Sequence, residues 1–369
     1  MSRAYLDHAA SSVVSKPVLA AIAEVWREYG NPSSLHGSGR AMRRRLEEAR
    51  ESIAGDLGAH PTEVVLTSGG TEANNLAVAG AAGDGEVLIS AVEHPSVAEA
   101  RHVFGERVRV LEVDEAGSVT PAQVRDAVED STRLVSVMWV NNETGLIQPV
   151  KQLAAAAHEA GALFHSDAVQ AVGHVPVSFD GLDLMTVSAH KLGGPVGVGA
   201  LVVRRGVTLR PTGFGGGQEA KLRSGTVPVA LAVGFAAALH EAVQRLDAEA
   251  ERLGSLKATL IQGLARLPDV RINTVAESSP AIVNAGFAGT RADDLLLLLD
   301  AAGIDCSTGS ACTAGVHQPS DVLLAMGRTL TEASASLRFS FGPTTTRREV
   351  DLLLAVLPDA LARARTAFA

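Results

Sequence analysis

The sequence contains very few cysteines. Only Cys306 and Cys312 occur among the 369 residues, and both lie in the short segment CSTGSACTAGVHQPS at 306–320. Two thiols are too few for a disulfide framework, for a structural metal site without more Cys or His at ligand spacing, or for an iron–sulfur cluster with its usual four ligands. We therefore expect reduced thiols and no metal bound by this chain.

The chain also lacks an excess of positive charge and any long apolar run. Its 32 Lys and Arg residues face 41 Asp and Glu residues, which gives a formal net charge of −9. No basic face is expected that could neutralise the phosphates of a nucleic acid or of an anionic lipid surface. The apolar run LLLLL at 295–299 is bounded by Asp294 and Asp300 and is too short for a membrane span. Without a signal-peptide pattern at the N-terminus, these features favour a cytoplasmic protein that binds neither nucleic acid nor membranes.

Short β-rich apolar runs alternate with helical patterns between about residues 60 and 205. Strands are expected at EVVLT (63–67), EVLIS (86–90), LVSVMWV (134–140), ALFHS (162–166) and LMTVS (184–188). This alternation predicts an α/β fold in which helices cover a mostly parallel mixed sheet. A long helical stretch then leads to further strands and helices. We predict a large α/β domain at 13–250 and a smaller α+β domain formed by 1–12 and 251–369.

Polar residues follow the predicted strands where each of them ends. In open α/β sheets, ligands bind at this edge. The residues are Gly70 and Thr71 after the first strand, Glu93 and His94 after the second, Asn141 and Asn142 after the third, Asp167 and Gln170 after the fourth, and Ser188, His190 and Lys191 after the fifth. Taken singly, each has an ordinary explanation as a turn, a helix cap or a loop hydrogen bond. Their convergence at one edge indicates a binding site.

These residue types match the requirements of pyridoxal phosphate. The small-residue turn that opens a helix at Thr71 can bind a phosphate, Asp167 can pair with a pyridinium nitrogen, and an imidazole can stack on the ring. The fourth requirement is a reactive amine. Only five lysines occur in the chain, and Lys191 is the one that follows an apolar strand and precedes a glycine run. We therefore expect Lys191 alone to be buried enough for its pKa to fall toward neutrality.

Longer motifs resemble those of the cysteine desulfurases, which belong to the class V aminotransferase superfamily of pyridoxal-phosphate enzymes. The motifs run in order along almost the whole chain and are AYLDHAA, GNPSSLHGSG, TSGGTEANNLA, EHPSV, VNNETGLIQPV, SDAVQAVG, SAHKLGGPVGVGAL, RSGT, STGSACT and SLRFSFG. The resemblance implies fold type I of these enzymes, the aspartate-aminotransferase-like fold. It also points to the group with a longer, mobile cysteine loop.

The resemblance implies a role for individual residues. Lys191 would bind the cofactor covalently, Asp167 would pair with its ring nitrogen, and His94 would stack on the ring and transfer protons. Gln170 would hydrogen-bond the phenolic oxygen. The residues that would hold the phosphate are Gly70, Thr71, Ser188 and His190, joined by Thr226 of a second subunit, so a homodimer is expected. The residues that would bind the substrate carboxylate are Arg338, Asn142 and Asn31.

The strand pattern around Arg338 supports this assignment independently. Side chains alternate between the two faces of a strand, so Leu337 and Phe339 share one face with Phe341. Arg338 then points to the other face, where it is either a solvated residue or a ligand for a carboxylate.

The implied reaction converts L-cysteine to L-alanine and transfers the sulfur to Cys312 as a persulfide, with Lys191 and His94 as the other catalytic residues. The sulfur would pass to an acceptor protein, such as an iron–sulfur scaffold or a relay for tRNA thiolation. Cys306 lies in the apolar run GIDCS and is expected only to pack. Two alternatives stay open. One is another class V enzyme, such as a selenocysteine lyase or an aminotransferase, and the other is a non-enzymatic α/β binding protein.

Overall fold

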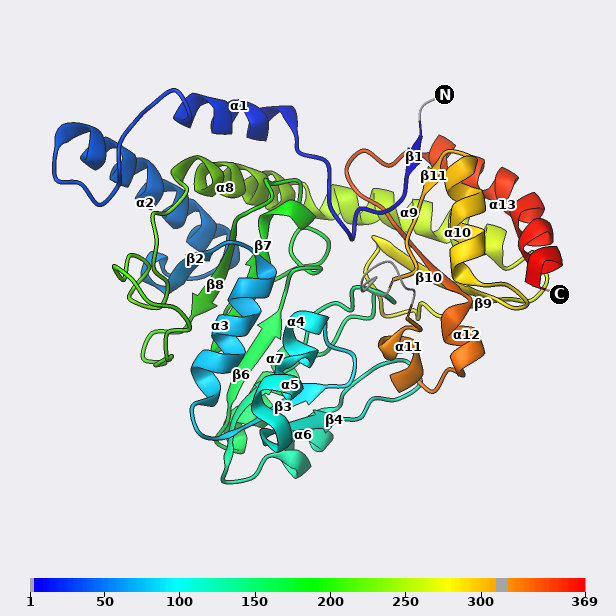
Figure 1. The fold of residues 1–369 in the computed structure, drawn as a ribbon, viewed down its shortest axis with the longest axis horizontal. Helices are drawn as coiled ribbons and strands as arrows, with labels where there is room; N and C mark the ends of the chain where they lie inside the picture. Colours follow the sequence, from blue (N-terminus) through cyan, green and yellow to red (C-terminus); the bar gives the residue numbers. More distant parts are fainter. Residues whose placement is uncertain (1–2, 310–317, 369) are drawn as a thin grey trace.

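The largest sheet in the computed structural model has seven strands in the order β2-β8-β7-β6-β5-β3-β4 (Figure 1). The structure describes residues 3–309 and 318–368. The strands of this sheet are β2 (Val64–Thr67), β3 (Glu86–Ser90), β4 (Val108–Leu111), β5 (Thr132–Ser136), β6 (Leu163–Asp167), β7 (Leu184–Ser188) and β8 (Gly199–Val203). Strands β4, β3, β5, β6 and β7 pair in parallel, whereas β8 is antiparallel to both of its neighbours. The sheet is therefore mixed and mostly parallel, as the sequence predicts.

Helices cover both faces of this sheet. They are α1 (Lys16–Val25), α2 (Gly37–Leu57), α3 (Gly70–Ala82), α4 (Pro95–Ala98), α5 (Ala100–Phe104), α6 (Pro121–Ala127), α7 (Val150–Glu159) and α8 (Val229–Gln244). Adjacent residues of a strand point to opposite faces, so Leu66 of β2 packs in the apolar cluster of α1, α2, α7 and α8, while Val65 packs with α3. Strands β2, β7 and β8 are buried along their whole length, which explains their continuous apolar runs.

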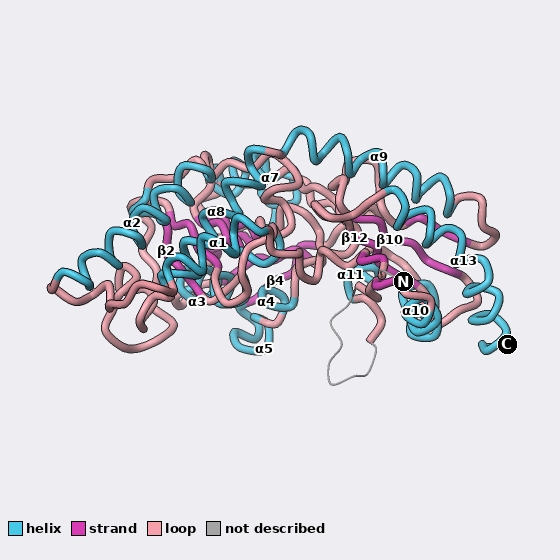
Figure 2. Tube along the Cα trace, turned by 90° about the horizontal axis from the view of Figure 1, so that it is seen from above, coloured by secondary structure: helices cyan, strands magenta, loops and turns pink. Residues whose placement is uncertain are grey.

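The chain leaves the large sheet through α9 (Leu246–Leu264), which runs toward the opposite end of the molecule (Figures 1 and 2). The remaining elements are α10 (Ala292–Ala301), α11 (Asp321–Ala325), α12 (Leu330–Ser334), α13 (Arg347–Phe368), a sheet of β9 (Val270–Ile272), β10 (Ile282–Phe287) and β12 (Ser336–Ser340), and the pair β1 (Ala4–Tyr5) and β11 (Ile304–Asp305). A separate apolar cluster joins Ala4 and Leu6 to side chains of α9, α10 and α13. The N-terminal residues therefore pack among residues that follow position 250. The predicted domain boundaries themselves stay a prediction.

Among the described residues, no single helix is long and apolar enough to cross a membrane. The pair α8 and α9, bent by 71° at their junction, meets that test only when the two helices are taken together, by length and composition. The apolar side chains of α8 lie in the core of the large sheet and those of α9 in the cluster beside α13.

The segment between β1 and α1 crosses from the smaller sheet to the ends of the large-sheet strands. Asp7 forms a bridge to Ser340 of β12, and the Ala9 amide donates to the Ser340 hydroxyl at 2.8 Å. A few residues later, the Ser12 amide donates to the carbonyl of His190 at 2.8 Å. This crossing places the carbonyl groups of residues 9 and 10 beside the edge where the sequence predicts a site.

Candidate active site

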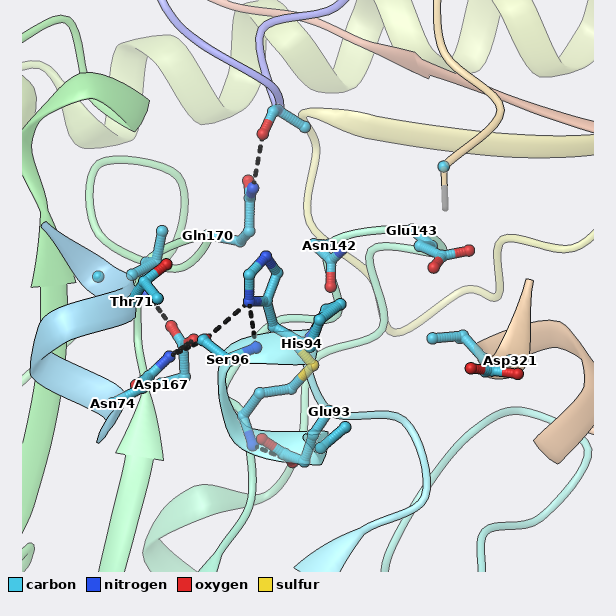
Figure 3. A pocket seen from close by; sticks show the side chains of 18 of the residues that line it. Thr71, Asn74, Glu93, His94, Ser96, Asn142, Glu143, Asp167, Gln170 and Asp321 are labelled. Atoms are coloured by element: carbon cyan, nitrogen blue, oxygen red, sulfur yellow. Dashed lines mark hydrogen bonds between the residues drawn. The ribbon is translucent and has the colours of Figure 1, made fainter. Parts of the chain in front are cut away.

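A pocket of about 850 Å³ lies at the carboxyl ends of the parallel strands. The residues singled out in the sequence that line it are Gly70, Thr71, Glu93, His94, Asn142, Asp167, Gln170, Ser188, His190, Lys191 and Arg338. Figure 3 shows how several of these side chains face one space. Residues from the N-terminal segment and from the C-terminal part of the chain complete the lining, among them Ala9, Ala10, Ser307 and Asp321. The pocket is thus built by the large sheet on one side and by β12 and its neighbours on the other.

Lys191 ends a short 3₁₀ turn (Ala189–Lys191) between β7 and β8. Its Nζ donates hydrogen bonds to the carbonyl oxygens of Ala9 at 2.6 Å and Ala10 at 2.9 Å. Burial lowers the pKa of Lys191 to about 8, and the positive charge of Arg338 adds to this effect while nearby carboxylates oppose it. A sizeable fraction of the amine is therefore neutral, and so nucleophilic, close to neutral pH.

The expectation that Lys191 alone would have a lowered pKa is wrong. Burial also lowers the pKa of Lys257, on α9, to about 8. Its Nζ donates to the Ser278 hydroxyl at 2.6 Å and to the Ser279 carbonyl at 2.9 Å, because the loop that contains both serines folds over the helix. A helical pattern in the sequence gives no sign of such a loop. Lys257 does not line the pocket.

The N-terminus of α3 and the Ser188 hydroxyl together provide donors for an anion. The residue that precedes the helix is Gly69, which has no side chain to accept a hydrogen bond from the first-turn amides. The Ser188 Oγ is buried, has no hydrogen-bond partner among the described residues, and lies 3.9 Å from the point that a Cβ on Gly69 would occupy. Strand β8 approaches this turn closely, since a Cβ on Gly199 would lie only 2.9 Å from the Gly69 backbone. Glycine at both positions keeps the cradle open.

Asp167 is buried at the end of β6 and accepts hydrogen bonds at both carboxylate oxygens. Its Oδ1 accepts from the Val169 amide at 2.9 Å, and its Oδ2 accepts from Asn74 Nδ2 at 2.6 Å. Gln170, one turn further on, donates from Nε2 to the Ala9 carbonyl at 2.9 Å. The Ala9 carbonyl thus accepts from both Gln170 and Lys191.

His94 precedes the short helix α4 and caps it. Its Nδ1 accepts the Ser96 amide hydrogen at 3.1 Å and lies 2.7 Å from the Ser96 Oγ. Asn74 Nδ2, which also donates to Asp167, lies 2.8 Å from the same hydroxyl, so hydrogen bonds connect His94 to Asp167 (Figure 3). Burial lowers the pKa of His94, and although the Asp167 charge opposes this, the cations of Lys191 and Arg338 add to it. The imidazole is therefore mainly neutral at neutral pH.

Arg338 is buried, with only 5% of its surface exposed, so it is not a solvated residue. Leu337, Phe339 and Phe341 pack in the apolar core, as the strand pattern predicts, while Arg338 lines the pocket. Its guanidinium donates to the Asn142 carbonyl at 2.8 Å and to Asp7 Oδ1 at 2.9 Å. Two buried polar atoms at this point, Arg338 Nε and Asn142 Oδ1, have no partner among the described residues. Such unpaired groups suit a polar ligand such as an amino acid.

Two buried acids also line the pocket. Burial raises the pKa of Glu93 to about 8, so its carboxyl is mostly protonated at neutral pH, and it accepts hydrogen bonds from the Ser90 hydroxyl and, at 2.8 Å, from the Met138 amide. Burial also raises the pKa of Glu143, which accepts from the Ser320 hydroxyl. The sequence places Glu93 after a predicted strand without indicating a role for it, and nothing in the sequence singles out Glu143. Asn74 and Ser96 are not singled out either, although Asn74 lies three residues after Thr71 and so shares its helix face.

A family model described as aminotransferase class V matches residues 4–353. The chain belongs to the class V aminotransferase family. Its relatives include an "IscS-like cysteine desulfurase" of Mycobacterium tuberculosis, 49% identical over 99% of this chain and 98% of that protein. A "Cysteine desulfurase IscS" of Dictyoglomus turgidum is 40% identical over 98% and 95% of the two chains. These relatives confirm the resemblance inferred from the motifs.

Solved structures of class V proteins confirm the fold. A "NifS-like protein" superposes with a TM-score of 0.91 at 35% identity and covers 98% of this chain and 100% of its own. A structure described as "SspA in complex with cysteine" has a TM-score of 0.81 at 32% identity and covers 93% and 100% of the two chains. The expected fold type I architecture is therefore present in this class V chain.

Some described residues that were expected at the site do not line the pocket. Asn31 and Thr226 are exposed and lie elsewhere on the class V fold of this single chain, and Asn141 is buried outside the lining. Cys312 lies outside the described residues. Cys306 packs partly against the apolar cluster, and burial raises the pKa of its thiol to about 12. The thiol of Cys306 is therefore protonated at neutral pH, as expected for a packing residue.

Proposed function

We propose that this protein is a pyridoxal-phosphate-dependent cysteine desulfurase that converts L-cysteine to L-alanine and transfers the sulfur to Cys312 as a persulfide. The observation that carries the proposal is the buried Lys191 amine, with its pKa lowered to about 8, in a pocket that also contains Asp167, His94 and Arg338. The names of the relatives, at 40–49% identity, support the reaction. The structure described as a complex with cysteine supports the substrate.

The residues of the pocket suit the cofactor. The unpartnered Ser188 hydroxyl beside the N-terminus of α3 suits a phosphate, with Gly70, Thr71 and His190 in the same wall. The buried Asp167 carboxylate suits a pyridinium nitrogen, and the Lys191 amine suits covalent attachment. Pyridoxal phosphate, when bound, supplies an electron sink for the amino acid.

The chain's own residues would bind the substrate and move its protons. Arg338 Nε would donate to the substrate carboxylate, with Asn142 beside it. Asn31 is exposed and outside the pocket of this single chain, so its contact with the substrate stays a prediction. Lys191, as a partly neutral amine, would accept a proton, and His94 would take part in the proton transfers. Gln170 would hydrogen-bond the phenolic oxygen of the cofactor. The persulfide would form without an external oxidant. The carbon–sulfur bond of the substrate would break, and its sulfur would bond to the sulfur of Cys312. The Cys312 thiol would lose one hydrogen and the substrate carbon would gain one.

A homodimer would complete the site. Large apolar side chains are exposed in the segment that follows α1 and in the glycine-rich segment GFGGG at 213–217, among them Trp26 (70%), Tyr29 (83%), Leu35 (87%) and Phe214 (101%). Such exposure favours burial against a second copy of the chain. Thr226, which is exposed and follows this glycine-rich segment, would then reach the phosphate of the partner's site. The sulfur-acceptor protein, the cytoplasmic location and the two-domain division stay predictions.

The test compares the two cysteines. We expect Cys312→Ala to keep the yellow bound cofactor but to release no sulfide from L-cysteine under reductant, whereas Cys306→Ala should retain both. Sulfide and alanine are measured together in the same reaction. Undiminished turnover by Cys312→Ala would refute the proposal, as would a purified protein that stays colourless after incubation with pyridoxal phosphate. Strong discrimination against cysteine in favour of selenocysteine would instead indicate a selenocysteine lyase.

A further inference from the structure

Ser96 and Asn74 form a hydrogen-bonded bridge between His94 and Asp167. We propose that these two residues position His94 as the tautomer with its hydrogen on Nε2, so that the ring presents an N–H hydrogen-bond donor to the pocket. Ser96 and Asn74 are positioning residues, since they act through His94. The consequence for turnover rests on the proposed function, whereas the tautomer itself does not.

The direction of each hydrogen bond follows from the chemistry of the carboxylate. An ionised carboxylate only accepts, so the amide nitrogen of Asn74, and not its oxygen, must face Asp167. One hydrogen of Asn74 Nδ2 goes to Asp167 Oδ2 at 2.6 Å, and the other goes to the Ser96 Oγ at 2.8 Å. The Ser96 oxygen is therefore an acceptor toward Asn74, and its single hydroxyl hydrogen is available for another partner.

That other partner is Nδ1 of His94, which lies 2.7 Å from the Ser96 Oγ. The same nitrogen accepts the Ser96 amide hydrogen at 3.1 Å. A hydrogen on Nδ1 would point at the hydrogens of both donors. The Ser96 hydroxyl could rotate to avoid this repulsion, but the Ser96 backbone amide could not. In the neutral ring, the hydrogen therefore resides on Nε2, which points away from Ser96 (Figure 3).

The charges around the ring favour the neutral form. Among the groups that the structure describes, Asp167 is the charged group that stabilises a protonated ring, and the bridge through Asn74 and Ser96 separates it from Nδ1. Lys191 and Arg338, from the opposite walls, disfavour the protonated ring, as does burial. A neutral ring with its hydrogen on Nε2 offers an N–H hydrogen-bond donor there and has no lone pair at that nitrogen to accept a proton. His94 would thus face the reacting atoms as a hydrogen-bond donor at Nε2, and Lys191 would be the base.

The test reads the tautomer directly by NMR of protein labelled with ¹⁵N-histidine, in the holoenzyme. A His94→Gln variant identifies the signals of this ring. We expect Nε2 of wild-type His94 to be protonated and Nδ1 to be bare near neutral pH. Ser96→Ala leaves only the backbone amide facing Nδ1, so it should weaken the preference for Nε2 and raise the pKa of His94, and Ser96→Thr should restore the wild-type pattern. Asn74→Ala should weaken the preference as well, because the Ser96 hydroxyl is then free to accept a hydrogen bond from Nδ1 while the Ser96 amide still faces that nitrogen.

Kinetics and a control separate positioning from a general loss of structure. Ser96→Ala should lower kcat by about tenfold with little change in KM, and it should move the acid limb of the pH profile upward, because a misplaced proton donor slows only the chemical step. Ser255→Ala, an exposed serine on α9, should change neither the spectrum nor the rate. A hydrogen on Nδ1 in the wild-type protein, or an unchanged spectrum in Ser96→Ala, would overturn the inference. The expected spectrum in a protein that releases no sulfide would uphold the tautomer and refute the proposed function.

Discussion

Lys191 and Lys257 have similar pKa values and different surroundings. Burial lowers the pKa of each to about 8, and each amine donates to carbonyl oxygens of a neighbouring loop. Lys191, however, lines a pocket of about 850 Å³, and its pKa also responds to Arg338, Asp7 and Asp167. At Lys257, burial alone accounts for the shift among the described groups. A lowered pKa therefore reports burial, and a reactive site needs in addition a cavity and charges that respond to a ligand.

The largest expected effect comes from removing one lysine or the other. Lys191→Ala should abolish covalent capture of pyridoxal phosphate and lower sulfide release by at least about a thousandfold, because no other amine lines the described part of the pocket. Lys257→Ala should keep both properties. Borohydride reduction followed by peptide mass mapping locates the cofactor. An adduct on Lys257, or capture by Lys191→Ala at the wild-type rate, would break the distinction between the two lysines.

The second prediction uses Arg338, whose charge contributes to the pKa shift of Lys191 but not to that of Lys257. The neutral amine is the nucleophile, so covalent capture by the apoprotein should accelerate as the pH rises, with a midpoint near 8. Arg338→Leu removes a cation that lowers this pKa, so the midpoint should move up. For each unit of that shift, the rate at pH 7 should fall about tenfold.

Amine acylation of Lys257, followed by mass spectrometry against pH, provides the control for Arg338→Leu. Its midpoint should stay near 8 in both proteins, because Arg338 does not contribute to the Lys257 shift. Equal movement of both midpoints would indicate a general loosening of the fold. An unmoved Lys191 midpoint would show that Arg338 does not act on the amine.

The sequence predicted which residues at the ends of the large-sheet strands line the pocket. Gly70, Asp167 and Lys191 each follow a buried apolar strand, and parallel strands bring their ends to one edge without any knowledge of long-range contacts. Arg338 was predicted from strand alternation together with the SLRFSFG motif. Periodicity and the order of the motifs were sufficient to locate these residues, because the local structure of a strand determines where its side chains and its end lie.

The contacts that the sequence did not predict are between distant segments. The Ala9 carbonyl accepts from Lys191 across 182 positions of sequence, and Arg338 pairs with Asp7 across 331. Lys257 is covered by a loop that no helical pattern indicates, so its pKa was misjudged. Ser96 belongs to the motif EHPSV, but its proposed role depends on a contact with Asn74. Asn74 in turn contacts the Asp167 side chain. Tertiary packing decides such pairs, and a single sequence contains no direct record of it.

The smallest effect is expected at the tether of Lys257. Ser278→Ala removes the 2.6 Å contact of Lys257 Nζ but leaves the Ser279 carbonyl at 2.9 Å, so the free energy of unfolding at pH 7 should fall by about 1 kcal/mol. Chemical denaturation measures the loss. Above pH 8, where the folded-state amine is increasingly neutral and its hydrogen bonds are no longer charge-assisted, the difference between the two proteins should shrink. Cofactor capture by Lys191 should be unchanged at every pH in this variant, because Ser278 lies outside the pocket. A loss of capture would mean that the loop over α9 is coupled to the pocket. The two lysines would then not be independent.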